Sequence, residues 1–109
     1  MATLTVGTII RTGTGFESAL VAAAGGGDEF ANTGFEFFRI TNGAITCNVT
    51  FTTPRTVAGM AITDLAVAVG AGTTRMIGPF PVGTYNNGNG LVQVTYDDVT
   101  NVTVEVLTF

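Results

Sequence analysis

Catalysis by this chain would have to rely on carboxylates, because the sequence contains eight aspartates and glutamates but no histidine. Histidine is the usual general base near neutral pH and the commonest zinc ligand, so base catalysis and zinc binding both lack their ordinary residue. The one serine, Ser18, follows Glu17 and has no nucleophile-elbow glycines around it, so we expect no hydrolytic triad. These residues indicate a protein that is not an enzyme.

Paired carboxylates remain the catalytic alternative, since two such groups can hydrolyse a glycosidic bond. Most of the acids stand at predicted turns or beside glycines, where acidic side chains keep loops soluble. The full set is Glu17, Asp28, Glu29, Glu36, Asp64, Asp97, Asp98 and Glu105. We therefore expect solvated acids and no catalytic pair.

Two acidic segments offer the oxygen ligands that calcium accepts, residues 97–98 (DD) and residues 28–32 (DEFAN). Neither has the alternate-residue spacing of a calcium-binding loop, so both favour solvated turns. The glycine runs at residues 13–15 and 25–27 lack the phosphate-loop pattern, and the second is followed by two acids that would repel phosphate. We expect no metal and no cofactor.

The charge balance argues against nucleic-acid and membrane partners. The net charge is −4, and the basic residues are four arginines with no lysine, so no basic stripe is present to displace counterions from phosphates. The most apolar stretch, residues 57–72, is broken by Asp64 and falls short of the roughly 18 residues that span a bilayer. The start of the chain shows no signal-peptide pattern, which predicts synthesis in the cytoplasm.

Alternating apolar residues indicate strands along nearly the whole chain, with turn signals between them. Asn42-Gly43 and residues 86–90 (NNGNG) favour tight turns. Cys47 stands in an alternating run and is interpreted as a small strand residue. The expected strands cover residues 3–10, 35–41, 45–52, 65–69, 73–77, 91–96 and 102–107.

This pattern predicts an all-β fold, a single antiparallel β-sandwich or jelly-roll-like domain with a flexible N-terminal arm. Residues 1–26 would form an N-terminal strand and a glycine-rich arm, and residues 27–109 the core. The one helical candidate, residues 16–24, could supply two turns or none before it meets three glycines.

The stretch MIGPFPVGTY, residues 76–85, contains no charge and two prolines. Pro79 and Pro81 donate no ladder hydrogen bond and hold the residues before them in extended conformations. The stretch is therefore expected as an edge strand or as the place where a strand leaves its sheet. Phe80, held between the prolines, would either plug the core or face a neighbouring subunit.

The surface that these strands present is weakly charged, since only 11% of the residues are charged. Natural sheets protect their edges with lysines and inward-pointing charges, and this chain has no lysine. We expect the surface to be covered by other copies or by a larger assembly, with the arginines either as polar anchors or as solvated charges. The candidate interface residues are Arg11, Arg39, Arg55, Arg75, Phe80, Tyr85 and Phe109.

Several segments carry a resemblance to a known family. GDEFANTG, TVAGMAITD, AGTTRMIGPFPVGTYN and VTYDDVTNVTVEVL resemble the small head decoration, or cement, proteins of tailed bacteriophages over residues 27–109. The resemblance implies a non-enzymatic sandwich or jelly-roll protein on the exterior of the virion capsid. It also implies homotrimers that bind the major capsid protein and bridge shell subunits.

A second interpretation is a β-sandwich adhesion or carbohydrate-binding module displayed on a virion. Such modules use exposed aromatic platforms, and the chain has no tryptophan and only Tyr85 and Tyr96 as tyrosines. A third, a small hydrolase, would need a base that the sequence does not offer. The decoration protein is therefore the favoured expectation.

Overall fold

The computed structural model describes residues 1–13 and 21–108, which are built almost entirely from strands. The prediction of an all-β protein is confirmed. In this part of the chain, no helix has the length and apolar character that crossing a bilayer requires. The elements are β1 (Ala2–Leu4), β2 (Val6–Thr8), β3 (Val21–Ala22), β4 (Asp28–Ala31), β5 (Glu36–Asn42), β6 (Cys47–Phe51), β7 (Thr56–Val57), β8 (Met60–Ala61), β9 (Leu65–Val69), β10 (Thr74–Ile77), α1 (Val82–Tyr85), β11 (Leu91–Tyr96) and β12 (Val102–Thr108).

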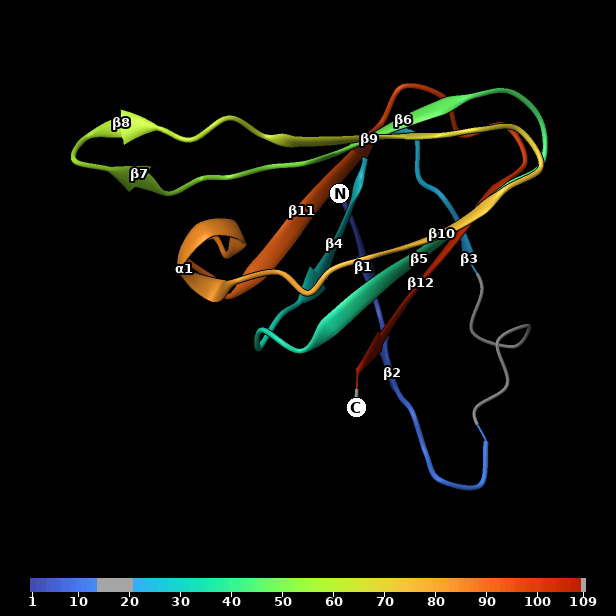
Figure 1. The fold of residues 1–109 in the computed structure, drawn as a ribbon, viewed down its shortest axis with the longest axis horizontal. Coiled ribbons are helices and arrows are strands. Elements are labelled where there is room, and N and C mark those ends of the chain that lie inside the picture. Colours follow the sequence, from blue (N-terminus) through green and yellow to red (C-terminus); the bar gives the residue numbers. More distant parts are fainter. Residues whose placement is uncertain (14–20, 109) are drawn as a thin grey trace.

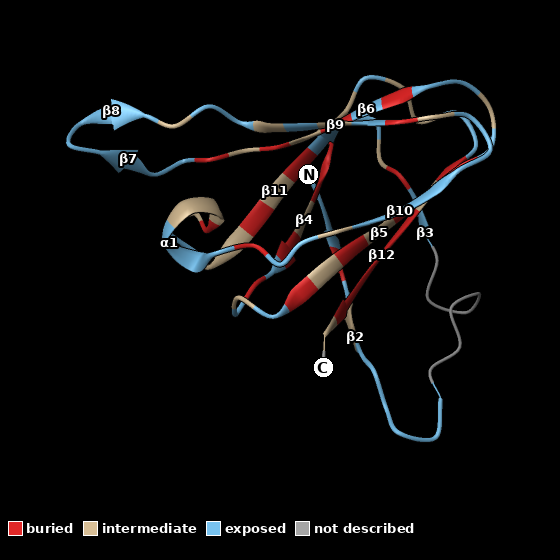
Figure 2. Cartoon of the chain, in the orientation of Figure 1, coloured by how far each residue is buried: buried red, intermediate tan, exposed pale blue. Residues whose placement is uncertain are grey.

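The strands form two larger sheets and one separate hairpin (Figure 1). The first sheet has the order β1-β4-β11-β6-β9, and the second has the order β10-β5-β12-β2 with β3 also paired to β12. Side chains of the two sheets meet in one core, where the ring of Phe38 on β5 lies 6.0 Å from Phe30 on β4 and 5.2 Å from Phe51 on β6. Figure 2 shows the buried residues along these central strands. Burying each such ring contributes about 1.5–3 kcal/mol.

The prediction of a purely antiparallel arrangement is wrong, because both sheets are mixed. β1 pairs in parallel with β4, and β2 pairs in parallel with β12, whereas the other pairs among the described strands are antiparallel. A parallel pair needs a long connection, and residues 5–27 supply one between β1 and β4. Alternation along one strand carries no information about the direction of its neighbour.

The N-terminal segment, expected as a strand followed by a flexible arm, contributes to both sheets where it is described. β1 adds to the edge of the first sheet, β2 adds to the second, and Leu4 lies in the core with 7% of its surface exposed. Most of the predicted helical candidate, residues 16–20 out of 16–24, lies outside the described residues. Residues 21–22, which belong to the same candidate, form the short strand β3.

The proline-rich stretch leaves the second sheet after Ile77, as predicted, and its Phe80 plugs the core. Phe80 is fully buried, and its ring lies 4.8 Å from that of Phe51 and 5.4 Å from that of Tyr85. Gly78 is required before it, because a Cβ atom there would stand 2.9 Å from the carbonyl oxygen of Glu36. α1, one turn that follows the second proline, was not foreseen from the sequence.

The single cysteine gives a first prediction. Cys47 is fully buried on β6, and burial raises the pKa of its thiol. Because the thiolate is the reactive form and the sulfur is inaccessible, we expect a thiol reagent to modify native Cys47 orders of magnitude more slowly than the urea-unfolded chain. An exposed thiol introduced as Ile45→Cys is the control and should react at once. Rapid modification of native Cys47 would contradict the burial of β6.

Candidate functional site

The β7–β8 hairpin projects from one end of the molecule, away from both sheets (Figure 1). Its two strands pair Thr56 with Ala61 and Val57 with Met60. Ala58 and Gly59 form the turn, with φ of 52° and 78°. Positive φ at both central positions gives the twist that suits a two-residue hairpin, and glycine adopts it without strain. The sequence carries no Asn-Gly signal here, so this hairpin was not predicted.

The tip of the hairpin is apolar and uncovered. Met60 is 71% exposed and Val57 is 65% exposed, the highest values among the large hydrophobic side chains of the described residues. No charged residue occurs between Arg55 and Asp64. Figure 2 shows both strands as exposed. An apolar projection of this kind is typical of a surface that binds another macromolecule.

Hydrogen bonds hold the base of the hairpin. The carboxylate of Asp64 accepts bonds from the backbone N–H of Thr53 at 2.9 Å and from its hydroxyl at 3.0 Å. The Thr53 hydroxyl also lies 2.6 Å from the carbonyl oxygen of Ile62, and Thr53 is 8% exposed. Because a two-stranded hairpin alone is marginally stable in water, these bonds are what set the direction in which it projects.

A buried pair of asparagines connects the hairpin base to the core. Arg55 Nε donates to the carbonyl oxygen of Asn86 at 3.0 Å. The amide of Asn86 donates to the carbonyl oxygen of Asn32 at 2.9 Å, and Asn32 Nδ2 donates to Asn86 Oδ1 at 2.6 Å and to the carbonyl oxygen of Phe80 at 2.8 Å. The hairpin base, the end of β4 and the Phe80 loop therefore form one connected unit.

The four arginines predicted as interface anchors lie in different settings. Arg11 is exposed after β2, and Arg75 is exposed on the edge strand β10. Arg55 is exposed at the hairpin base. Arg39 is half-buried on β5, where its NH1 lies 2.7 Å from Glu105 Oε1. Arg39 and Arg75 lie on paired strands, where Arg75 stands opposite Ile40, the neighbour of Arg39. Arg11 follows β2 at the opposite edge of that sheet, and Arg55 stands at the hairpin base.

The three aromatic candidates also differ. Phe80 belongs to the core, so its ring is not available to a neighbouring chain. Tyr85 is half-buried, and its ring packs edge-on against that of Phe80. Phe109 lies outside the described residues. Sequence reasoning missed Val57 and Met60, whose only signal was their position in the most apolar stretch of the chain.

Three carboxylates that were expected to be solvated are buried: Asp28, Glu36 and Glu105. Asp28 accepts a hydrogen bond from the hydroxyl of Tyr96 at 2.7 Å, and Glu36 accepts bonds from Thr33. These acids are kept in the interior because hydrogen bonds replace their lost water. The prediction of loop acids failed for Asp28 and Glu36, since alternation places every second residue of β4 and β5 inside whether or not it is apolar. Glu105 lies between the alternating core residues Val104 and Val106 of β12 and is buried beside Arg39.

The segments considered for calcium form ordinary hydrogen bonds within the chain. The carboxylate of Asp97 accepts from the backbone N–H of Asn48 at 2.7 Å and from its side chain at 2.8 Å. These bonds hold the pKa of Asp97 below its ordinary value. Across residues 1–13 and 21–108, no three histidine, cysteine, aspartate or glutamate side chains lie together as a metal site would require.

Tyr96 gives a prediction on alkaline stability. Burial, and then its hydrogen bond to Asp28, raise the pKa of Tyr96 above its ordinary value of 10.0. A group whose pKa is raised by folding stabilises the folded protein at pH values below its pKa in the unfolded chain. For Tyr96 this stabilisation is lost as the pH rises above about 10. We expect the urea midpoint of the natural chain to fall between pH 9 and pH 11 more steeply than that of Tyr96→Phe. Equal slopes would contradict the role of this phenol.

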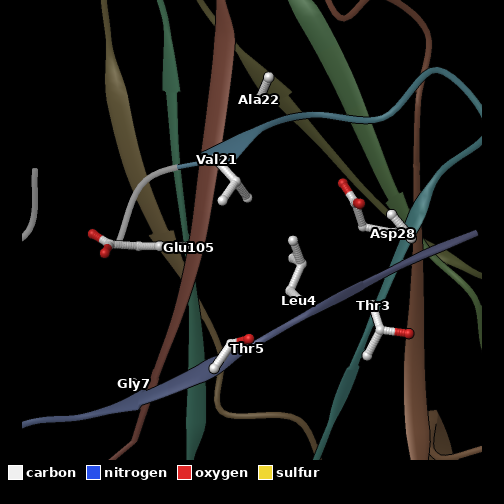
Figure 3. A pocket seen from close by; sticks show the side chains of 9 residues that line it. Thr3, Leu4, Thr5, Gly7, Val21, Ala22, Asp28 and Glu105 are labelled. Atoms are coloured by element: carbon white, nitrogen blue, oxygen red, sulfur yellow. The ribbon is translucent and has the colours of Figure 1, made fainter. Parts of the chain in front are cut away.

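A cavity of about 530 Å³ opens among the N-terminal strands. Figure 3 shows the side chains of Leu4 and Val21 near its centre, with Asp28 on one side and Glu105 on the other. The wall consists of apolar and small polar residues with two acids: Ala2, Thr3, Leu4, Thr5, Gly7, Val21, Ala22, Asp28 and Glu105. Sequence reasoning did not foresee this cavity, because residues of β1–β4 and β12 meet there only through the topology.

The candidate site is thus a pair of features, an apolar hairpin held at its base and a cavity beside β1, β2 and β3. Two acids, Asp28 and Glu105, line the cavity, and the hairpin has no charged residue between Arg55 and Asp64. No family model, no curated protein and no solved structure matches this chain.

Proposed function

We propose that this chain is a non-enzymatic structural protein of a tailed-phage head, which decorates the capsid exterior and stabilises it by bridging shell subunits. The observation that carries the proposal is the β7–β8 hairpin, whose exposed Val57 and Met60 project on a base held by hydrogen bonds. A preorganised apolar projection loses little freedom when it binds. The segments that resemble decoration proteins include this hairpin, in TVAGMAITD.

The proposed fold is a β-sandwich of the jelly-roll type. Two sheets that share one core of phenylalanine and valine side chains support this class. The proposed assembly is a homotrimer that binds the major capsid protein. Each contact would be weak, and symmetry would repeat it many times over the shell, so that the assembled state is favoured by mass action.

The interface is expected to be mostly apolar, because the exposed hairpin has no charged residue between Arg55 and Asp64. Salt screens contacts between exposed charges but leaves apolar contacts in place. Attachment to the shell should therefore survive high salt. Release of the protein from virions by salt alone would contradict this mode of attachment.

The test is quantitative mass spectrometry of purified virions of the phage that encodes the chain, after a wash at high salt. A copy number equal to that of the major shell protein, or a simple fraction of it, supports the proposal. A trace amount would overturn it. In that event a glycan array would test the carbohydrate-binding alternative, for which half-buried Tyr85 and Tyr96 offer little stacking surface.

A further inference from the structure

The β7–β8 hairpin and the N-terminal cavity complement each other, and we propose that they meet between two copies of the chain. In this contact Val57 and Met60 of one copy enter the cavity beside β1, β2 and β3 of the next. The occupant of the cavity is thus a second copy. The inference deepens the proposed function. It rests on that function only in placing the resulting oligomer on a capsid.

The hairpin of a given copy lies on a different side of the molecule from its own cavity. Figure 1 shows the hairpin at one end of the long axis and β3 toward the other, in a molecule 42 Å long. Short bonds at the base, such as Thr53 to Asp64, hold the hairpin in this direction. The contact must therefore join two copies through different surfaces, and such contacts close into rings when the rotation between copies allows.

The cavity suits an uncharged apolar guest. Its volume of about 530 Å³ lies in the range of pockets that enclose small ligands. Leu4 and Val21 supply apolar wall, while Asp28 and Glu105 already bond within their own chain, to Tyr96 and Arg39. A tip without charge brings no unpaired charged group of its own into the cavity.

The surroundings of the cavity are acidic, whereas the hairpin base carries one charge of each sign, with Arg55 directly before β7 and Asp64 three residues after β8. The acids near the cavity are Asp28, Glu29 and Glu105. These acids attract the Arg55 of an approaching hairpin.

One hairpin tip is too small for a stable interface, because stable interfaces bury roughly 800 Å² on each partner. A closed ring, in which every copy gives one hairpin and receives another, doubles the contacts of each copy without a new surface. The contact therefore predicts a closed oligomer, in which no hairpin and no cavity is left without a partner.

The first test is the molar mass of the purified chain by light scattering. We expect a multiple of the chain mass of 11.2 kDa for the natural protein and a fall to the single-chain mass for Val57→Thr with Met60→Ser. Phe35→Ser is the matched control, because Phe35 is 64% exposed elsewhere on the surface and should leave the mass unchanged. A monomeric natural chain overturns the inference and leaves the virion measurement unaffected.

The second test locates the contact by cross-linking. A mixture of Met60→Cys and Ala22→Cys chains should form a disulfide between copies under oxidation, since Ala22 lines the cavity. Met60→Cys mixed with Ile45→Cys is the control pair and should form none. The natural Cys47 is buried and stays out of the reaction. Disulfides between two Met60→Cys chains, or equal yields from both pairs, would overturn the assignment of the cavity.

Discussion

Phe80→Ala is expected to lower the free energy of unfolding by about 3–5 kcal/mol, the range for removing a buried phenylalanine ring. Phe80 has no exposed surface, and its ring touches those of Phe30, Phe51 and Tyr85 at 5.6, 4.8 and 5.4 Å. The prolines on both sides restrict the backbone, so the loop cannot easily collapse into the space left behind. Since domains are stable by only about 5–15 kcal/mol, this loss would take at least about a fifth of the total.

The measurement is equilibrium unfolding in urea. We expect Phe80→Ala to lower the urea midpoint and to leave unchanged the slope of the unfolding free energy against urea concentration. Phe35→Ala provides the control, because the same substitution at a residue that is 64% exposed should change stability by less than about 0.5 kcal/mol. Similar losses for the two variants would contradict the role of Phe80 as a core plug.

Loss of the plug should also loosen the hairpin, because the carbonyl oxygen of Phe80 accepts a hydrogen bond from Asn32. Asn32 pairs with Asn86, whose carbonyl oxygen accepts the bond from Arg55 at the hairpin base. Hydrogen exchange of β7 and β8 in Phe80→Ala would therefore be faster than in Phe35→Ala under native conditions.

The sequence predicted the long strands well, because period-two alternation is a direct consequence of burying one face. Residues 45–52 and 91–96 were expected as strands, and β6 and β11 fall within them. β4 was missed, since its acids at positions 28 and 29 suggested a loop and the partner of Asp28 is Tyr96, far away in sequence. A buried acid can be recognised only when its distant partner is known.

The direction of the N-terminal strands could not be predicted for a related reason. Alternation in residues 3–10 indicated one strand, whereas the chain divides at Thr5 and joins two sheets. The partner of an N-terminal strand depends on which sheet edges are free, and the free edges are defined only when both sheets have formed. The cavity between β1, β2 and β3 results from the same division of the chain, so it could not be predicted from the sequence either.

The candidate interface illustrates the limit of residue-type arguments. Arginines and aromatic residues are enriched at interfaces, and this expectation led to Phe80, which is in the core, and to Arg39, which is bonded to Glu105. Val57 and Met60 are less distinctive residue types, and their exposure results from the turn at Ala58 and Gly59. Their importance lies in the geometry of the hairpin.

Arg39→Met carries the second large prediction, a loss of about 3 kcal/mol in the free energy of unfolding at neutral pH. The side chain of Glu105 is 1% exposed, and its Oε1 lies 2.7 Å from Arg39 NH1. Its Oε2 is buried and has no hydrogen-bond partner among the described residues. Removing the guanidinium would leave a buried carboxylate with no counter-charge, which costs far more than the pair contributes when intact.

Two further variants separate this explanation from simple loss of packing. Arg75→Met removes an exposed arginine from the neighbouring strand β10 and should cost less than about 1 kcal/mol. Adding Glu105→Leu to Arg39→Met should restore most of the lost stability, because the uncompensated charge is then gone. If the double variant is no more stable in urea than Arg39→Met alone, the loss comes from contacts of the arginine stem, and the pair has no electrostatic role in holding β5 against β12.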